Sequence, residues 1–269
     1  MSFQVRTVES DDGVELVYEL AAGVPRAPTP VFVHGWCGDR RLWDPLVASL
    51  GGRRPCLRLD LAGHGASGLG RRRYTMEAFG RDVARCVRAA GVGPAMLVGH
   101  SMAGEVIVEA ALELGGSVIG VVGVDALWNP GREIDDRLIR DILGPFRRDY
   151  PRAAEDYVRA MFLPDADPSQ IRRLVDGVLR VPEEVGMGAL EEVLRHRGAL
   201  QRSLRRLGAP VFLLNSADWR ATDRAAAAEF GLDVRPIHGV GHFSMIERPR
   251  EVAAALEEIF EELSPESGA

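Results

Sequence analysis

Apolar and polar positions alternate along this chain in two patterns. Short runs in which almost every residue is apolar, such as 31–33, 95–98 and 118–124, are separated by longer stretches with apolar residues at helical spacing. Short apolar runs bounded by turn residues indicate buried strands, whereas the longer stretches indicate amphipathic helices. Because strands that alternate with helices usually form a parallel sheet covered on both faces, the pattern predicts an α/β fold.

The individual elements follow from the same pattern. The predicted strands are 3–8, 14–20, 31–33, 56–59, 95–98, 118–124, 211–214 and 234–237. The predicted helices between them are 41–50, 76–90, 102–114, 224–230 and 250–263. Asp11-Asp12-Gly13 indicates a hairpin turn between the first two strands, and Thr75 is expected to cap the helix that follows it.

The alternation stops in one part of the chain. Residues 129–207 carry only helical patterns, interrupted by prolines. Roughly 75 residues without a strand are far more than an ordinary connection within a compact sheet. We therefore expect residues 1–128 and 208–269 to form the α/β core, with 129–207 inserted as a helical cap between the sixth and seventh strands.

Composition narrows the class of protein. The 269 residues carry a formal net charge of −6, and 46% of them are hydrophobic, which is typical of a soluble globular protein and argues against a dedicated nucleic-acid binder. No apolar run approaches the ~20 residues of a membrane span, and the N-terminus lacks the apolar core of a secretory signal. Cys37, Cys56 and Cys86 are too scattered for a disulfide framework or a zinc site. We expect a cytoplasmic protein without a metal.

All 33 basic residues are arginine. The absence of lysine excludes a lysine Schiff base. Arg147, Arg148, Arg172 and Arg173 fall at helical spacing with acidic residues and are expected to face solvent. An arginine that pointed into the molecule would instead be suited to bind a substrate carboxylate.

The segment with the clearest chemistry is Val98–Gly104, where a predicted strand passes directly into a predicted helix. Its centre reads Gly99-His100-Ser101-Met102-Ala103, a Gly-x-Ser-x-Gly-like pattern with Ala103 in the last small position. A sharp strand-to-helix turn of this kind exposes the serine hydroxyl at the edge of a sheet, and the helix N-terminus supplies free amides beside it. The pattern predicts a nucleophilic serine.

Three further segments follow other predicted strands. His34-Gly35-Trp36 follows 31–33, the glycine-rich segment 60–67 follows 56–59, and Gly239–Phe243 follows the last strand. In this order the segments resemble the α/β-hydrolase superfamily, in particular its capped esterase, lactonase and haloperoxidase-like members. The resemblance extends over residues 14–125 and 208–263, and it implies an α/β-hydrolase fold with a serine hydrolase site.

The resemblance implies a catalytic role for particular residues. Ser101 would be the nucleophile and His242 the base that takes its proton. The acid that orients His242 is expected after strand 211–214, which favours Asp218. Asp125, at the end of strand 118–124, is the alternative acid, and Asp223 is a third candidate.

The remaining site residues follow from the same comparison. The backbone amides of Trp36 and Met102 would form the oxyanion hole. A small-molecule substrate would lie in a mostly apolar pocket under the cap. The candidate lining residues are His34, Trp128, Met161, Phe162 and Phe243.

The function expected from these residues is hydrolysis of a small carboxylic ester or lactone through an acyl-enzyme, without a cofactor. Acyl transfer or carbon–carbon bond hydrolysis on the same triad is the alternative within enzymes. A small-molecule-binding relative that has lost turnover is the alternative outside catalysis. The residue pattern leaves these alternatives open.

Overall fold

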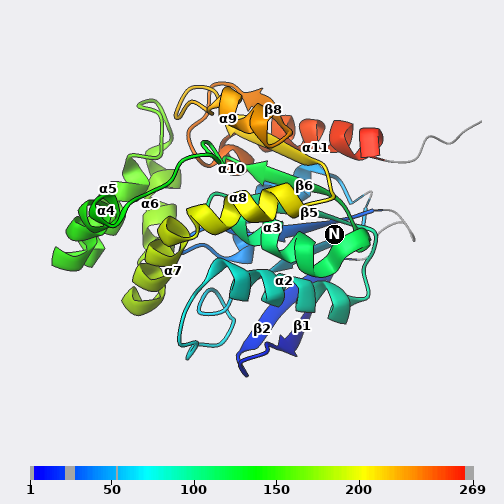
Figure 1. Ribbon diagram of the computed structural model, residues 1–269, viewed down its shortest axis with the longest axis horizontal. Coiled ribbons are helices and arrows are strands. Elements are labelled where there is room, and N and C mark those ends of the chain that lie inside the picture. Colours follow the sequence, from blue (N-terminus) through cyan, green and yellow to red (C-terminus); the bar gives the residue numbers. More distant parts are fainter. Residues whose placement is uncertain (1–2, 22–27, 53, 264–269) are drawn as a thin grey trace, which may run out of the picture.

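A computed structural model describes residues 3–21, 28–52 and 54–263. The outermost residues of the predicted core, 1–2 and 264–269, lie outside this described part. Within it, eight strands form one sheet in the order β1-β2-β4-β3-β5-β6-β7-β8 (Figure 1). Their bounds are β1 Phe3–Glu9, β2 Glu15–Ala21, β3 Thr29–Val33, β4 Cys56–Leu59, β5 Ala95–His100, β6 Val118–Val124, β7 Val211–Ser216 and β8 Leu232–Ile237.

The sheet is mostly parallel, as the alternation of strands and helices predicts. The pairing of β1 with β2 is antiparallel because these strands form the predicted hairpin, and β2 also pairs antiparallel with β4. The other strand pairs among the described residues are parallel. Every residue of β3, β4 and β5 is buried, which is typical of strands covered by helices on both faces. The α/β-hydrolase fold expected from the sequence is confirmed.

The core helices pack in two groups. One contains α2 (Met76–Ala90) and α3 (Ala103–Leu114), and the other contains α1 (Asp44–Ser49) and α11 (Pro249–Leu263). The short helix α9 (Arg224–Glu229) packs on β8, whereas α10 (Ser244–Glu247) packs against α1 and α11. Thr75 caps α2 as predicted, since its hydroxyl accepts a hydrogen bond from the Ala78 amide at 3.1 Å.

The predicted helix 41–50 differs in its first turn. Residues Arg40–Trp43 form a 3₁₀ helix, and only Asp44–Ser49 are α-helical. The Asp39 carboxylate accepts a hydrogen bond from the Arg41 amide, which satisfies the tighter first turn. The short helix η2 (Gly115–Ser117) connects α3 to β6.

All the regular secondary structure described between β6 and β7 is helical. It contains α4 (Asp136–Arg148), α5 (Tyr150–Arg159), α6 (Pro168–Val178), α7 (Glu183–Arg195) and α8 (Arg197–Arg206). Helices α4 to α7 lie together beyond one edge of the core, whereas α8 runs along α3 (Figure 1). The division into core and cap stays a prediction. Helix α8, although it belongs to the predicted cap, packs on the core helix α3.

Candidate active site

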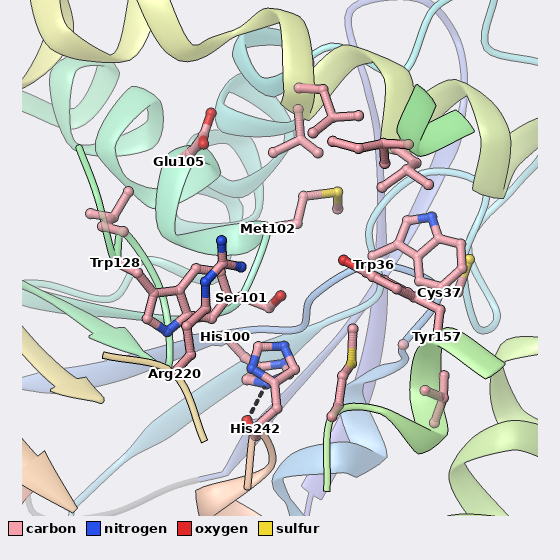
Figure 2. Close-up of a pocket in the computed structure, with 18 of the residues that line it drawn as sticks. Trp36, Cys37, His100, Ser101, Met102, Glu105, Trp128, Tyr157, Arg220 and His242 are labelled. Atoms are coloured by element: carbon pink, nitrogen blue, oxygen red, sulfur yellow. Dashed lines mark hydrogen bonds between the residues drawn. The ribbon is translucent and has the colours of Figure 1, made fainter. Parts of the chain in front are cut away.

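Ser101 lies at the sharp turn between β5 and α3. Its backbone has a φ of +56°, in the left-handed region that non-glycine residues rarely adopt, and its amide donates a hydrogen bond to the Val124 carbonyl oxygen at 3.1 Å. A Cβ on Gly99 would lie 2.5 Å from the Ala103 carbonyl oxygen, so glycine is required for the turn to close. The turn directs the Ser101 hydroxyl into a cavity (Figure 2).

His242 lies in the loop after β8, and its ring lines the same cavity. The amide of His242 donates to the Met161 carbonyl oxygen at 2.8 Å, which fixes the loop against the inserted helices. The ring is buried, and its Nδ1 lies 3.0 Å from Oδ2 of Asp125. Burial lowers the pKa of His242, and the charge of Arg220 lowers it further. The free imidazole is therefore neutral and suited to accept a proton.

Asp125 follows directly after β6 and is fully buried. Its Oδ1 accepts hydrogen bonds from Trp128 Nε1 and from the Ser216 amide, both at 3.1 Å. Burial raises the pKa of Asp125, and these two donors oppose the rise. In its ionised form the Asp125 carboxyl can only accept at Oδ2, so the His242 proton then resides on Nδ1 and leaves Nε2 free to accept.

The structure does not bring Asp218, the acid first expected, to His242. The hydroxyl of Ser216 accepts hydrogen bonds from the amides of Asp218 and Trp219, and this turn directs the Asp218 side chain outward. The Asp218 carboxylate is exposed and accepts from the Gly239 amide at 2.7 Å. The Trp219 ring occupies the space beside His242 instead, with ring centroids 4.6 Å apart.

Asp223, the third candidate acid, caps a helix. Its Oδ1 accepts from the Ala226 amide at 2.9 Å, in the first turn of α9. Of the three candidate acids, the alternative Asp125 is therefore the one hydrogen-bonded to His242.

The cavity above Ser101 has a volume of about 390 Å³. Three of the expected lining residues, Trp128, Met161 and Phe243, border it, as do Trp36 and Met102, whose amides are the expected oxyanion donors. Apolar side chains from α4, α5, α6 and α7 form the wall opposite the sheet. The inserted helices thus enclose a mostly apolar space over the serine.

Two predicted lining residues lie elsewhere. His34 is fully buried below the site, where its Nε2 accepts a hydrogen bond from the Leu61 amide at 3.0 Å. Phe162 stacks on the outer side of Phe243, with ring centroids 5.2 Å apart, and does not reach the cavity. Both positions support neighbouring loops rather than a ligand.

The cavity also has polar lining residues that the sequence pattern does not reveal. They are Glu105, Arg132, Tyr157, Arg197 and Arg220. In Figure 2 the Tyr157 hydroxyl and the Arg220 guanidinium point toward the space beside Ser101. The surface arginines expected in the inserted helices, Arg147, Arg148, Arg172 and Arg173, are exposed.

The described residues contain no group of three or more His, Cys, Asp and Glu side chains that could hold a metal ion. In the same described part, no helix is both long and apolar enough to cross a membrane.

The fold and the serine turn are those of a known family. The family model described as "Alpha/beta hydrolase family" matches residues 31–255, so the chain belongs to this family of enzymes. Its solved structural neighbours include a thermophilic esterase from Thermogutta terrifontis, with a TM-score of 0.81, 22% identity and coverage of 98% of this chain and 100% of the other. An enol-lactonase from Burkholderia xenovorans also has a TM-score of 0.81, with 20% identity over 95% and 100% of the two chains.

Curated relatives are more varied in activity. A 2-(acetamidomethylene)succinate hydrolase from Mesorhizobium japonicum is 32% identical over 98 residues, 36% of this chain and 35% of its own length. A dihydrolipoyllysine-residue acetyltransferase component of an acetoin cleaving system from Cupriavidus necator is 27% identical over 91% of this chain and 66% of its own length. The chain thus spans less than two thirds of these two relatives. A 2-succinyl-6-hydroxy-2,4-cyclohexadiene-1-carboxylate synthase from Yersinia pseudotuberculosis is 26% identical over 84% of this chain and 85% of its own length.

Proposed function

We propose that this protein hydrolyses a small carboxylic ester or lactone through an acyl-enzyme on Ser101, with His242 as the base and Asp125 as the acid. The observation that carries the proposal is the buried pairing of His242 with Asp125 at 3.0 Å, on the wall of the cavity into which Ser101 points. A serine hydroxyl is a weak nucleophile, and a neutral imidazole in this position is the group that activates it.

In the first half of the reaction, Ser101 Oγ attacks the carbonyl carbon of the ester while His242 Nε2 takes the hydroxyl proton. The carbonyl π electrons move to oxygen, giving a tetrahedral oxyanion. Collapse of this intermediate breaks the bond to the leaving oxygen, which receives the proton from His242. In the second half, water attacks the acyl-Ser101 carbonyl, its proton passes through His242 to Ser101 Oγ, and the carboxylic acid leaves.

The oxyanion would be bound by the backbone amides of Trp36 and Met102. Both residues line the cavity, and neither amide has a hydrogen-bond acceptor within the described part of the chain. Amides without an acceptor are costly unless a ligand uses them, and fixed donors aimed at a developing negative charge are the main source of catalysis in such sites. Close approach of the two turns depends on Gly35, where a Cβ would lie 3.0 Å from Ser101 Cβ.

The assignment to ester or lactone chemistry draws support from the enclosed, mostly apolar cavity and from the structural neighbours named as an esterase and an enol-lactonase. An apolar enclosure suits the acyl chain of a small substrate and excludes bulk water from the oxyanion.

The test is turnover of p-nitrophenyl butyrate by wild type, Ser101→Ala and a control, Ser117→Ala, whose serine is exposed in η2 away from the cavity. Loss of the nucleophile is expected to lower kcat/KM by at least about 10³-fold. The control should stay within about twofold of wild type, as surface substitutions usually do. Retention of more than a tenth of the activity in Ser101→Ala would overturn the proposal.

A further inference from the structure

Arg220 is a cation on the cavity wall without an anionic partner. It lies in the loop between β7 and α9, and its guanidinium carbon is 4.8 Å from the centre of the Trp128 ring. Within the described residues its side chain has no hydrogen bond or ion pair with the protein. The contact with Trp128 holds the guanidinium beside the cavity by a cation–π interaction while leaving its N–H groups free.

The acidic groups in and near the cavity already have other hydrogen-bond or ion-pair partners. Glu105 Oε1 lies 3.3 Å from Arg197 Nε, and Glu105 Oε2 lies 2.8 Å from His196 Nδ1. Asp125 is buried behind His242 and accepts from it. Neither carboxylate forms an ion pair with Arg220, and the charge of Asp125 acts on Arg220 only at longer range.

A second arginine adds to the positive charge. Arg132 lines the same cavity and also has no side-chain ion pair in the part of the chain that the structure describes. Partial burial lowers the pKa of Arg220, and the charges of Arg197 and Arg132 lower it further, whereas Tyr157 and Asp125 oppose this shift. The residue as a whole stays exposed at the mouth of the site. An anion in the cavity would offset these neighbouring charges and accept hydrogen bonds from the guanidinium.

Arg220 lies close to the proposed catalytic residues. Its charge is close enough to His242 to lower the pKa of that histidine. Figure 2 shows Arg220 beside Trp128 and directed toward the space around Ser101 and His242. An anion bound by Arg220 would therefore belong to the same small molecule whose carbonyl is at Ser101.

We propose that Arg220, aided by Arg132, binds a carboxylate of the substrate, so that the preferred ester or lactone is one that carries a free carboxylate elsewhere in the molecule. The inference rests on the proposed hydrolase function. The planar fork of a guanidinium matches the two oxygens of a carboxylate. The apolar wall formed by α4 to α7 then accommodates the carbon chain between the carboxylate and the reacting carbonyl.

The test compares two esters that differ only at the far end of the acyl chain. Mono-p-nitrophenyl adipate ends in a carboxylate, and methyl p-nitrophenyl adipate ends in a neutral ester. Wild type is expected to have at least a tenfold higher kcat/KM for the carboxylate. At pH 8, above the acid limb of both enzymes, the ratio of kcat/KM for the carboxylate ester to kcat/KM for the neutral ester should fall about 10- to 100-fold in Arg220→Met, as expected for removal of a charge-assisted hydrogen bond.

Two further variants separate recognition from folding. Arg220→Lys keeps the positive charge but loses the planar guanidinium that can bind both carboxylate oxygens. Its kcat/KM for the carboxylate ester should therefore lie between the values for wild type and Arg220→Met. Arg224→Met removes an exposed arginine at the start of α9, outside the cavity, and should leave both rates within twofold.

The outcomes distinguish the two proposals. If wild type hydrolyses both esters equally and Arg220→Met changes neither rate selectively, the carboxylate site is wrong while the hydrolase proposal stands. If neither adipate ester nor p-nitrophenyl butyrate is hydrolysed, the hydrolase proposal fails; if only the butyrate is hydrolysed, the hydrolase proposal stands. In both cases calorimetric titration with adipate decides the inference. Saturable adipate binding that weakens at least tenfold in Arg220→Met supports it, and no binding or unchanged binding overturns it.

Discussion

Replacing Asp125 by asparagine tests the proposed acid directly. In the native protein Asp125 Oδ1 accepts from two donors, Trp128 Nε1 and the Ser216 amide, while Oδ2 accepts from His242. An asparagine can keep the first two bonds only if its amide NH₂ group faces His242. That group donates, so His242 Nδ1 must lose its proton, and the proton moves to Nε2. Nε2 then cannot accept the proton of Ser101.

The expected loss of kcat is large because His242 in the wrong tautomer cannot act as the base. The equivalent change in a serine protease triad lowers kcat about 10⁴-fold, which corresponds to about 5 kcal/mol in the barrier. We expect Asp125→Asn to lower kcat on p-nitrophenyl butyrate by about 10³- to 10⁴-fold. Thermal unfolding followed by circular dichroism verifies that the variant is folded.

Asp218→Asn is the matched control. The exposed Asp218 carboxylate accepts from the Gly239 amide, and an asparagine oxygen can accept the same bond. Its kcat should therefore stay within about threefold of wild type. A folded Asp125→Asn enzyme with more than a tenth of wild-type kcat, or an equal loss in Asp218→Asn, would refute the assignment.

Gly35→Ala should destabilise the fold by about 1–3 kcal/mol and lower kcat, because the new Cβ would lie 2.8 Å from the His100 carbonyl oxygen. The control is Gly116→Ala, where a Cβ would meet no atom within 4 Å, and its melting temperature should be nearly that of wild type. The acid limb of kcat/KM against pH should lie below pH 6.5, because burial and Arg220 lower the pKa of His242, and Arg220→Met should move that limb to higher pH. His196→Gln should destabilise the protein by on the order of 3 kcal/mol at pH 6 and by much less at pH 10 in urea titrations.

The sign of the His196 prediction follows from its surroundings. Burial alone would lower the pKa of His196, but hydrogen bonds to Glu105 and Glu109 raise it from 6.5 to about 9. The stabilisation is therefore fully present below pH 6.5 and is lost as the pH rises through about 9. An equal loss at both pH values would show that packing, and not charge, accounts for the effect.

For the glycine pair, equal melting temperatures would contradict the steric argument, and an unmoved acid limb in Arg220→Met would contradict the electrostatic one.

The parts of the fold that depend on local pattern could be predicted from the sequence. Short apolar runs gave the strands, and the Ser101 turn was recognisable because strand, small residues and helix follow one another without a break. His242 was recognisable from its place in a glycine-containing loop after the last strand.

The choice of acid could not be predicted because it depends on a contact between loops. Asp125 and Asp218 follow adjacent parallel strands, β6 and β7, so both begin near the same edge of the sheet. The Ser216 hydroxyl accepts from the Asp218 amide, which turns the second loop outward, and donates to the Val240 carbonyl oxygen at 2.7 Å. This second bond joins the two loops across 24 residues, and Asp125 is left beside His242. Arg220 was missed for a related reason, since a loop residue has no periodicity that reveals which way it points.

The central claim, an activated Ser101, is tested most directly by covalent labelling with a fluorophosphonate probe, read by intact mass and peptide mapping. The account predicts one adduct per chain, on the peptide that contains Ser101, no adduct in Ser101→Ala and greatly slowed labelling in Asp125→Asn. An unlabelled wild-type protein, or an adduct on another residue, would contradict it.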